Sequence, residues 1–382
     1  MALGTLLRWL GPWAGDAAPP AVRRAELMLP GPRPMRCYLY APEPESVEPG
    51  VTARAIRWLS PPQGPCGAYL VSPGLHHLGP DDPRLDRFCR VLAAAGLLVL
   101  APFLPDYIAL RVTAEAVEDL GSAWDHLAEL ATAERLPPPA IFSISFGSAP
   151  AITLASRDTH RDRVGPLVIF GGYAEFEAAV RFAITGEVRR GAEVLRLRRD
   201  PLNSPVVFLN LLPWMRVEGD RVVLERAWRT MVERTWGRAE LKEAGAREPY
   251  AVEIAEGLPP ELRELFLVGC GLRPGGAALL EEALSAATGA LWFTDPRPAL
   301  SRLRAPVVIV HGRDDDVIPY SEADKLCAAL PPGHPHRVFL TGLYGHTGAV
   351  RPPLQSLARE AATLLGVARA LLEAPQGVIR VG

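Results

Sequence analysis

A serine, an aspartate and a histidine occur in three separate segments whose surroundings favour catalytic chemistry. Ser145 lies in the run IFSISFGS (141–148), where a short apolar stretch gives way to an alanine-rich one. Asp315 follows the apolar run 307–310, and His346 lies in a later Gly-His-Thr segment. A serine hydroxyl is a weak nucleophile until a base takes its proton, and a carboxylate can orient that base. The chain order serine, aspartate, histidine therefore predicts nucleophilic catalysis.

The segment around Ser145 predicts a sharp turn from a strand into a helix. Such an elbow exposes a serine hydroxyl at the carboxyl edge of a sheet. Ser143 and Ser148 are rival serines, but the first is expected at the end of the strand and the second on the helix. Neither has the apex position. Without a catalytic role, Ser145 would be a buried serine that caps the following helix.

These segments resemble the α/β-hydrolase superfamily. The resemblance rests on the elbow, on the apolar strand followed by HGRDDDVIP, on the late Gly-His pair and on the alternation of strands and helices. It covers roughly residues 65–175 and 297–370. The usual elbow is G-x-S-x-G, and here Ser143 replaces the first glycine. Because that position needs a small side chain, serine weakens the match without breaking it.

The resemblance implies a nucleophile and a base. Ser145 would attack, and His346 would take the serine proton and return it to the leaving group. His346 follows the last predicted strand in a Gly-His loop, the place that the family uses, whereas without this role it would be a surface loop histidine. His311 resembles a structural position of the family. The rivals by residue type are His76, His77, His126, His160, His311, His334 and His336.

The resemblance also implies which of three consecutive aspartates orients the imidazole. The family places this acid three residues after a glycine, and Asp315 stands three residues after Gly312. The Asp315 carboxylate would hold the imidazole tautomer and stabilise the imidazolium. Asp314 and Asp316 are expected to be solvated or to stabilise the loop.

Two backbone N–H groups would have to stabilise the oxyanion. One belongs to Phe146, the residue after the nucleophile. The family takes the other from the loop after an early strand. Here this loop is SPGL (72–75), in which Pro73 replaces the usual histidine, so Leu75 is the second predicted donor. His76 and His77 follow, and they either border the pocket or have no catalytic role.

The elements that would position these residues alternate along the chain. Strands are expected at 26–29, 36–40, 68–71, 97–100, 140–143, 167–170, 306–310 and 337–340, and helices at 82–95, 114–130, 321–330 and 354–372. This alternation predicts an α/β fold with a mostly parallel, doubly wound sheet. Ligands bind such sheets at the carboxyl ends of the strands, where Ser145 is expected.

Residues 177–296 break this alternation and are helical in pattern. Their tryptophans are Trp214, Trp228, Trp236 and Trp292. The family resemblance implies a helical cap here, with the tryptophans in its own core and some apolar surface lining the pocket. The predicted division is 1–176 for the first part of the core with an N-terminal extension, 177–296 for the cap and 297–382 for the second part of the core.

Composition excludes several classes of partner and cofactor. The net charge of −2 and the pI near 6.5 give no electrostatic reason to expect nucleic acid. The five cysteines are scattered and form no C-x-x-C pair, which indicates free thiols in a reducing cytoplasm. No metal-binding or nucleotide-binding motif stands out, so no cofactor is expected.

The apolar N-terminal segment, Met1 to Trp13, predicts an amphipathic helix that rests on the protein or on a membrane surface. It is too short to span a bilayer, which takes about 20 apolar residues. It also lacks the basic start of a signal peptide.

Together the patterns predict a cytoplasmic serine hydrolase that cleaves an ester or related acyl bond of a hydrophobic small molecule. One alternative is a non-catalytic binding or scaffold protein with the same fold, which Ser143 and Pro73 favour. Another is a lipid hydrolase docked on membranes through residues 1–13. The sequence leaves open esterase, thioesterase, peptidase or C–C hydrolase activity, and it leaves open the oligomeric state.

Overall fold

The structure is a computed structural model of the whole chain. It describes residues 2–10, 17–19, 22–31, 33–43, 64–191, 193–342, 344–345, 348–349 and 357–377.

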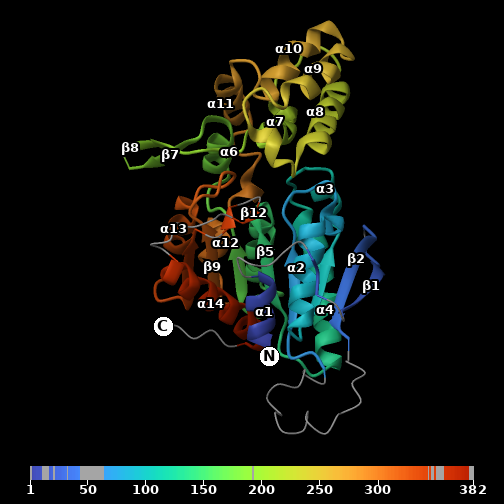
Figure 1. Ribbon diagram of the computed structural model, residues 1–382, viewed down its shortest axis with the longest axis vertical. Coiled ribbons are helices and arrows are strands. Elements are labelled where there is room, and N and C mark those ends of the chain that lie inside the picture. The colour runs from blue at the N-terminus through green and yellow to red at the C-terminus, as the bar shows by residue number, and fades with distance from the viewer. Residues whose placement is uncertain are drawn as a thin grey trace.

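An eight-stranded sheet forms the centre of the molecule (Figure 1). Its spatial order is β1 (Val22–Leu29), β2 (Met35–Pro42), β4 (Leu98–Pro102), β3 (Ala68–Ser72), β5 (Ala140–Ile144), β6 (Leu167–Phe170), β9 (Val307–Gly312) and β10 (His336–Thr341). The six strands from β4 to β10 are parallel, whereas β1 pairs antiparallel with β2, and β2 with β4. The prediction of a mostly parallel sheet is confirmed, and all eight predicted strands are present.

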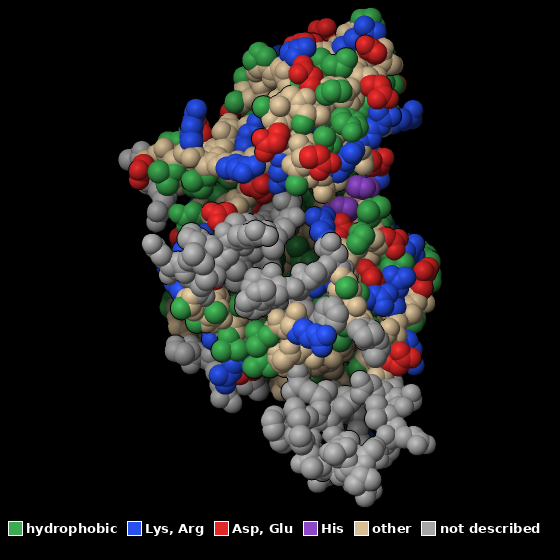
Figure 2. All heavy atoms as spheres, viewed as in Figure 1, with side chains coloured by type: hydrophobic (Ala, Val, Ile, Leu, Met, Phe, Trp, Pro, Cys, Tyr) green, Lys and Arg blue, Asp and Glu red, His purple; other side chains and the backbone are tan. Residues whose placement is uncertain are grey.

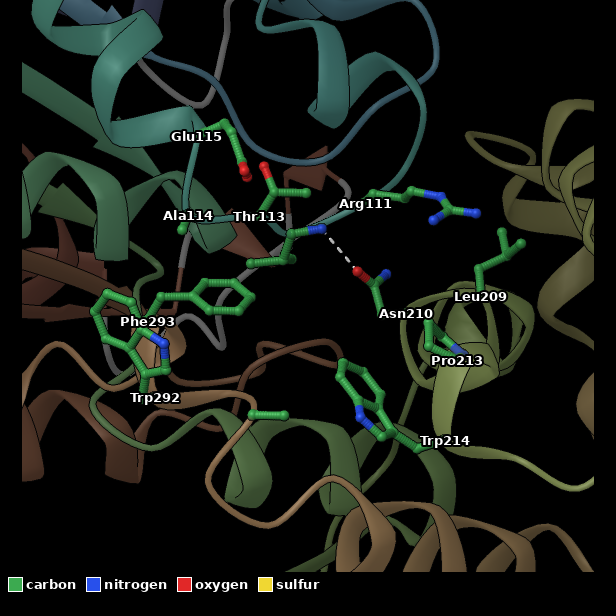
Figure 3. Close-up of a pocket in the computed structure, with 12 residues that line it drawn as sticks. Arg111, Thr113, Ala114, Glu115, Leu209, Asn210, Pro213, Trp214, Trp292 and Phe293 are labelled. Carbon is green, nitrogen blue, oxygen red and sulfur yellow. Dashed lines mark hydrogen bonds between the residues drawn. The ribbon is translucent and has the colours of Figure 1, made fainter.

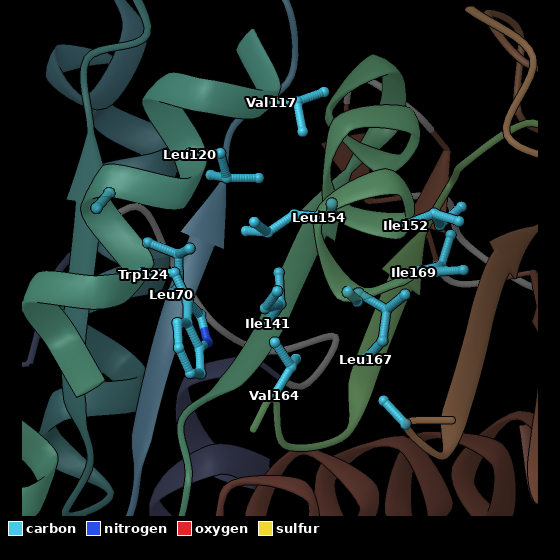
Figure 4. Close-up of a cluster of buried hydrophobic side chains, with 14 of the residues drawn as sticks. Leu70, Val117, Leu120, Trp124, Ile141, Ile152, Leu154, Val164, Leu167 and Ile169 are labelled. Atoms are coloured by element: carbon cyan, nitrogen blue, oxygen red, sulfur yellow. The ribbon is translucent and has the colours of Figure 1, made fainter. Parts of the chain in front are cut away.

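Helices cover both faces of the sheet, because its central strands are apolar on both sides. The core helices are α2 (Pro83–Ala94), α3 (Pro105–Ile108), α4 (Ala116–Ala133), α5 (Ser148–Ser156), α12 (Arg297–Leu300), α13 (Ser321–Ala328) and α14 (Leu357–Glu373). On one face, Leu120 and Trp124 of α4 meet Leu154 of α5 and strand residues such as Ile141 (Figure 4). On the other face, α2 and α14 bury Leu92 and Leu371 against the sheet.

The N-terminal helix α1 (Ala2–Leu10) packs against α2 and α14. Its Leu6 side chain is completely buried in the same apolar cluster as Leu92 and Leu371. The predicted N-terminal helix is therefore present, and it packs on the protein. Within the described ranges, no helix is long and apolar enough to cross a membrane.

The segment 177–296, called the insertion below, gathers at one end of the molecule (Figure 1). Its helices are α6 (Phe176–Thr185), α7 (Ser204–Leu211), α8 (Arg221–Thr235), α9 (Glu248–Glu256), α10 (Pro260–Gly269) and α11 (Gly276–Ala286). Positive and negative side chains are interspersed over its surface on the face that Figure 2 shows. Ion pairs such as Arg181 to Glu281, 2.8 Å, join neighbouring helices there.

The insertion departs from its prediction in two ways. It contains a hairpin, β7 (Glu187–Arg190) and β8 (Glu193–Arg196), where only helices were expected. Each strand has four residues, too few to establish a period-2 pattern in the sequence. In addition, the tryptophans do not form a core of the insertion's own: Trp228 is completely buried, but in an apolar cluster that the insertion shares with the core, and Trp292 is 73% exposed.

Candidate active site

Ser145 lies at the apex of a strained turn between β5 and α5. β5 ends at Ile144, a single 3-10 turn spans Ser145–Gly147, and α5 begins at Ser148. The φ angle of Ser145 is +53°, in the left-handed region that side chains disfavour. Such strain persists only where the surrounding structure holds it, and it clusters at functional sites. The turn thus has the predicted strand-to-helix shape, but Ser145 itself is buried, with 4% of its surface exposed, whereas the elbow was expected to expose its hydroxyl.

The loop after β3 presses directly against this turn. A Cβ atom on Gly147 would lie 2.3 Å from the carbonyl oxygen of Pro73, so only glycine fits there. The Ser72 hydroxyl donates to the Gly147 carbonyl at 2.8 Å. A Cβ on Gly74 would lie 3.3 Å from the Cβ of Ser145. The main chain that leads to Leu75, the predicted oxyanion donor, thus runs beside the candidate nucleophile.

Ser143 has a packing role in β5. Its side chain is completely buried, and its hydroxyl donates to the carbonyl of Val168 on the neighbouring strand β6 at 3.1 Å. A small side chain with a satisfied hydroxyl is therefore compatible with this position of the elbow.

Asp315 is held firmly in the loop after β9. Its carboxylate accepts the backbone N–H groups of Val317 at 2.9 Å and Ile318 at 2.8 Å. Beneath it, His311 is completely buried and donates from Nε2 to the Ile318 carbonyl at 2.9 Å. His311 thus has the structural role that the family resemblance implied. The Asp315 side chain is itself buried, whereas Asp314 is exposed.

Asp316 belongs to a largely buried ion cluster that joins this loop to the insertion. The Lys242 ammonium lies 2.6 Å from the carboxylate of Asp316 and 2.8 Å from that of Asp200. The backbone N–H of Asp200 also donates to the Asp316 carbonyl at 2.6 Å. Burial alone would lower the pKa of Lys242, but the two carboxylates outweigh it and raise that pKa. Sequence reasoning missed this cluster, although Lys242 is one of only two lysines.

His76 and His77 extend the loop after β3 toward the insertion. Their rings stack at 4.7 Å, and the His76 ring lies 5.7 Å from Trp236 of the insertion. The Nδ1 atom of His76 accepts the Leu78 N–H at 3.2 Å, and its Nε2 faces Asp82 at 3.1 Å. Burial lowers the pKa of His76 to about 4, so the ring is neutral. Both histidines border the junction of core and insertion.

His346, the predicted base, lies outside the described residues, so its role stays a prediction. Two short strands in this region, β11 (Tyr344–Gly345) and β12 (Gly348–Ala349), pair antiparallel. Among the described residues, no group of three His, Cys, Asp or Glu side chains could hold a metal ion. All five cysteines are free thiols.

The structure combines three features in the predicted order: a mostly parallel sheet, the strained Ser145 after β5, and the loop after β9 that holds Asp315, called the acid loop below. The fold is that of the α/β-hydrolases. The sharp turn from strand to helix, which the sequence predicted from a short motif, is therefore present as a structural feature.

No family model matches the chain, and no curated protein is similar to it in sequence. Solved structures share its general arrangement at low identity. The acylaminoacyl peptidase of Pyrococcus horikoshii is 9% identical with a TM-score of 0.45, over 94% of this chain and 43% of that one. A puromycin-hydrolysing peptidase of Mycobacterium tuberculosis is 16% identical with a TM-score of 0.46, and the match covers 97% of this chain and 42% of the peptidase. A dienelactone hydrolase of Anabaena variabilis is 13% identical with a TM-score of 0.45, and the match covers 94% of this chain and 100% of the hydrolase. The chain thus spans less than half of either peptidase.

Proposed function

We propose that the protein is a serine hydrolase that cleaves an ester or a related acyl bond through an acyl-enzyme on Ser145. The observation that carries this proposal is the φ angle of +53° at Ser145, at the apex of a turn that Gly147 and Pro73 hold closed. A serine that served only to cap α5 would have no reason to adopt a disfavoured backbone conformation.

The reaction would proceed in two steps. The Ser145 oxygen attacks the acyl carbonyl while His346 takes the hydroxyl proton, and the backbone N–H groups of Phe146 and Leu75 stabilise the oxyanion. The intermediate collapses as His346 returns the proton to the leaving group. Water, deprotonated by His346, then attacks the acyl-enzyme; the bond between the acyl carbon and the Ser145 oxygen breaks, His346 returns the proton to that oxygen, and the acid is released. Asp315 orients the imidazole throughout.

The surroundings of the elbow favour a hydrophobic substrate. The Phe146 ring lies 5.2 Å from that of Tyr173 and 6.1 Å from that of Phe176. These aromatic residues belong to an apolar cluster that continues into the insertion through Phe208 and Trp228. An acyl chain or aromatic group that leaves water beside this cluster gains about 25 cal/mol per Å² of buried apolar surface.

A fluorophosphonate probe followed by intact mass measurement tests the proposal. We expect a single adduct on the wild type and none on Ser145→Ala. Ser148→Ala is the matched control, because Ser148 begins α5 next to the elbow and its hydroxyl is buried. A panel of p-nitrophenyl esters of increasing chain length then identifies the preferred acyl group.

The alternative is a non-catalytic protein that uses this fold for binding. Pro73, at the position of the family's usual histidine, favours it. Ser143 no longer does, because its hydroxyl is buried and bonded to the Val168 carbonyl. A folded wild-type protein that forms no adduct would support this alternative and contradict the hydrolase.

A further inference from the structure

A pocket lies at the junction of core and insertion. Its volume is about 380 Å³, within the usual size range of small-molecule sites. Three segments line it: 111–115 before α4, 209–214 at the end of α7, and 290–293 after α11 (Figure 3). None of these residues belongs to the elbow, to the loop after β3 or to the acid loop.

Aromatic side chains from two segments converge on this space. Phe293 and Trp214 project into it from different sides, beneath the main chain of Thr113 and Ala114 (Figure 3). The Trp292 ring stands 6.0 Å from the Phe293 ring at 88°, an edge-to-face contact that orients Phe293. Trp292 is nevertheless 73% exposed. Its ring therefore leaves aromatic surface at the rim of the pocket that a ligand can contact.

The pocket wall is fixed by hydrogen bonds between core and insertion. The Asn210 amide of α7 accepts the Val112 N–H at 2.7 Å and donates to the Leu110 carbonyl at 2.9 Å. It also donates to the Val206 carbonyl at 2.9 Å within its own helix. A wall held in this way needs little ordering when a ligand binds.

The polar lining side chains are largely engaged with protein partners. Arg111 pairs with Glu225 at 2.5 Å, and the Thr113 hydroxyl donates to Asp106 at 2.8 Å. Glu115, which is exposed at the rim, has no side-chain partner within the described part of the chain. Its carboxylate repels anions. The lining thus presents aromatic surface for stacking and a negative charge at the rim.

The geometry points to a binding site for an uncharged, planar aromatic compound that stacks against Phe293 and Trp214. Such a ligand contacts both core and insertion, so it stabilises their relative position when it binds. The inference goes beyond the proposed function, because it holds whether or not Ser145 is a nucleophile.

Calorimetric titration of the full chain with 2-naphthol tests this site, and 2-naphthoate serves as the anionic comparison. We use Ser145→Ala alongside the wild type, and expect saturable binding of one 2-naphthol to each. Binding of 2-naphthoate should be at least about tenfold weaker, because Glu115 repels it. Absence of saturable 2-naphthol binding, or equal affinity for 2-naphthoate, would overturn the proposal.

Two variants locate the ligand. Trp292→Ala removes the edge-to-face support of Phe293, and we expect about tenfold weaker 2-naphthol binding. Ala290→Trp, also at an exposed lining position, fills the cavity and should abolish binding. Val222→Ala is the control, because this 59% exposed residue lies on α8 outside the pocket. Wild-type affinity in both pocket variants would place 2-naphthol elsewhere and contradict the inference.

The same protein samples, treated with the fluorophosphonate probe, separate the two proposals. An adduct on the wild type without 2-naphthol binding overturns the aromatic site alone. Binding of 2-naphthol to both proteins without any adduct overturns the hydrolase alone.

Discussion

At the scale of single residues, Ser145 owes its conformation to its neighbours. A left-handed backbone costs a side-chain-bearing residue roughly 1–2 kcal/mol. The contact between Gly147 and the loop after β3 offsets this cost, since that loop approaches closely enough to exclude even a methyl group. The motif therefore needs glycine at position 147 because no larger side chain fits beside the loop. A left-handed backbone is not the reason, since the φ angle of Gly147 is −65°.

Gly147→Ala tests this explanation. The added Cβ would lie 2.3 Å from the Pro73 carbonyl oxygen, so the loop must move. We expect a loss of about 1–3 kcal/mol in the free energy of unfolding, measured in urea, together with slower fluorophosphonate labelling. Gly257→Ala is the matched control, because its nearest neighbour would lie at 3.5 Å. Equal stability of the two variants would show that the loop does not enforce the turn.

Asp315→Asn separates the candidate acid from its neighbours. An amide oxygen can still accept the N–H groups of Val317 and Ile318, so the loop should keep its shape. We expect a fall in kcat on the order of 10³-fold or more on a p-nitrophenyl ester, since the wrong imidazole tautomer is favoured. Asp314→Asn, at an exposed position, should leave kcat unchanged. Similar losses in both variants would mean that the acid has been misassigned.

His76 should make the stability of the fold depend on pH. The buried ring has a pKa of about 4, whereas an unfolded chain binds the proton near pH 6.5. As the pH falls through this window, only the unfolded state gains the proton, so stability is lost. We expect a loss on the order of 3 kcal/mol from this group between pH 7 and pH 4.

Urea denaturation of His76→Gln across the same pH range measures this contribution. The variant should lose less stability on acidification than the wild type. His336→Gln, at an exposed position, is the control. If the stabilities of the wild type and His76→Gln change identically with pH, then the folded protein does not hold the His76 ring in its neutral form, and this explanation is wrong.

At the scale of elements, the sequence predicted what is local and missed what is distant. Each strand of the sheet is a short apolar run bounded by turn residues, and such runs are visible in a single sequence. The turn at Ser145 could likewise be expected from the residues around it. The cluster of Lys242, Asp200 and Asp316 could not, because its members are 42 to 116 positions apart and meet only in the folded chain. The rarity of lysine was the only signal.

Lys242→Met should show how strongly the insertion holds the acid loop. Without the ammonium group, the buried carboxylate of Asp200 and the largely buried carboxylate of Asp316 repel each other. We expect a loss of about 3–5 kcal/mol in the free energy of unfolding, the usual effect of breaking a buried ion pair from one side. The double variant Lys242→Met/Asp316→Asn should recover part of it. Additive losses in this cycle would show that the two side chains do not interact.

At the scale of the whole molecule, core and insertion share one apolar cluster. Leu110 and Ile318 of the core pack in the same cluster as Phe208, Trp228 and Phe266 of the insertion. Hydrogen bonds cross the same junction, such as that from the guanidinium of Arg229 to the Ile108 carbonyl at 3.0 Å. An insertion without its own separate core has no basis for unfolding independently.

We therefore expect a single cooperative unfolding transition. Far-UV circular dichroism reports the helices of both core and insertion. Tryptophan fluorescence reports the insertion more strongly, because four of the eight tryptophans lie there. The two signals should give coincident urea curves. Asn210→Ala leaves the Val112 N–H and the Leu110 carbonyl without the Asn210 amide as their partner. We expect this variant to lower the free energy of unfolding by about 1–3 kcal/mol, with the two curves still coincident. A fluorescence transition that precedes the loss of helix would instead show that the insertion unfolds first, so that the shared cluster does not couple it to the elbow and the acid loop.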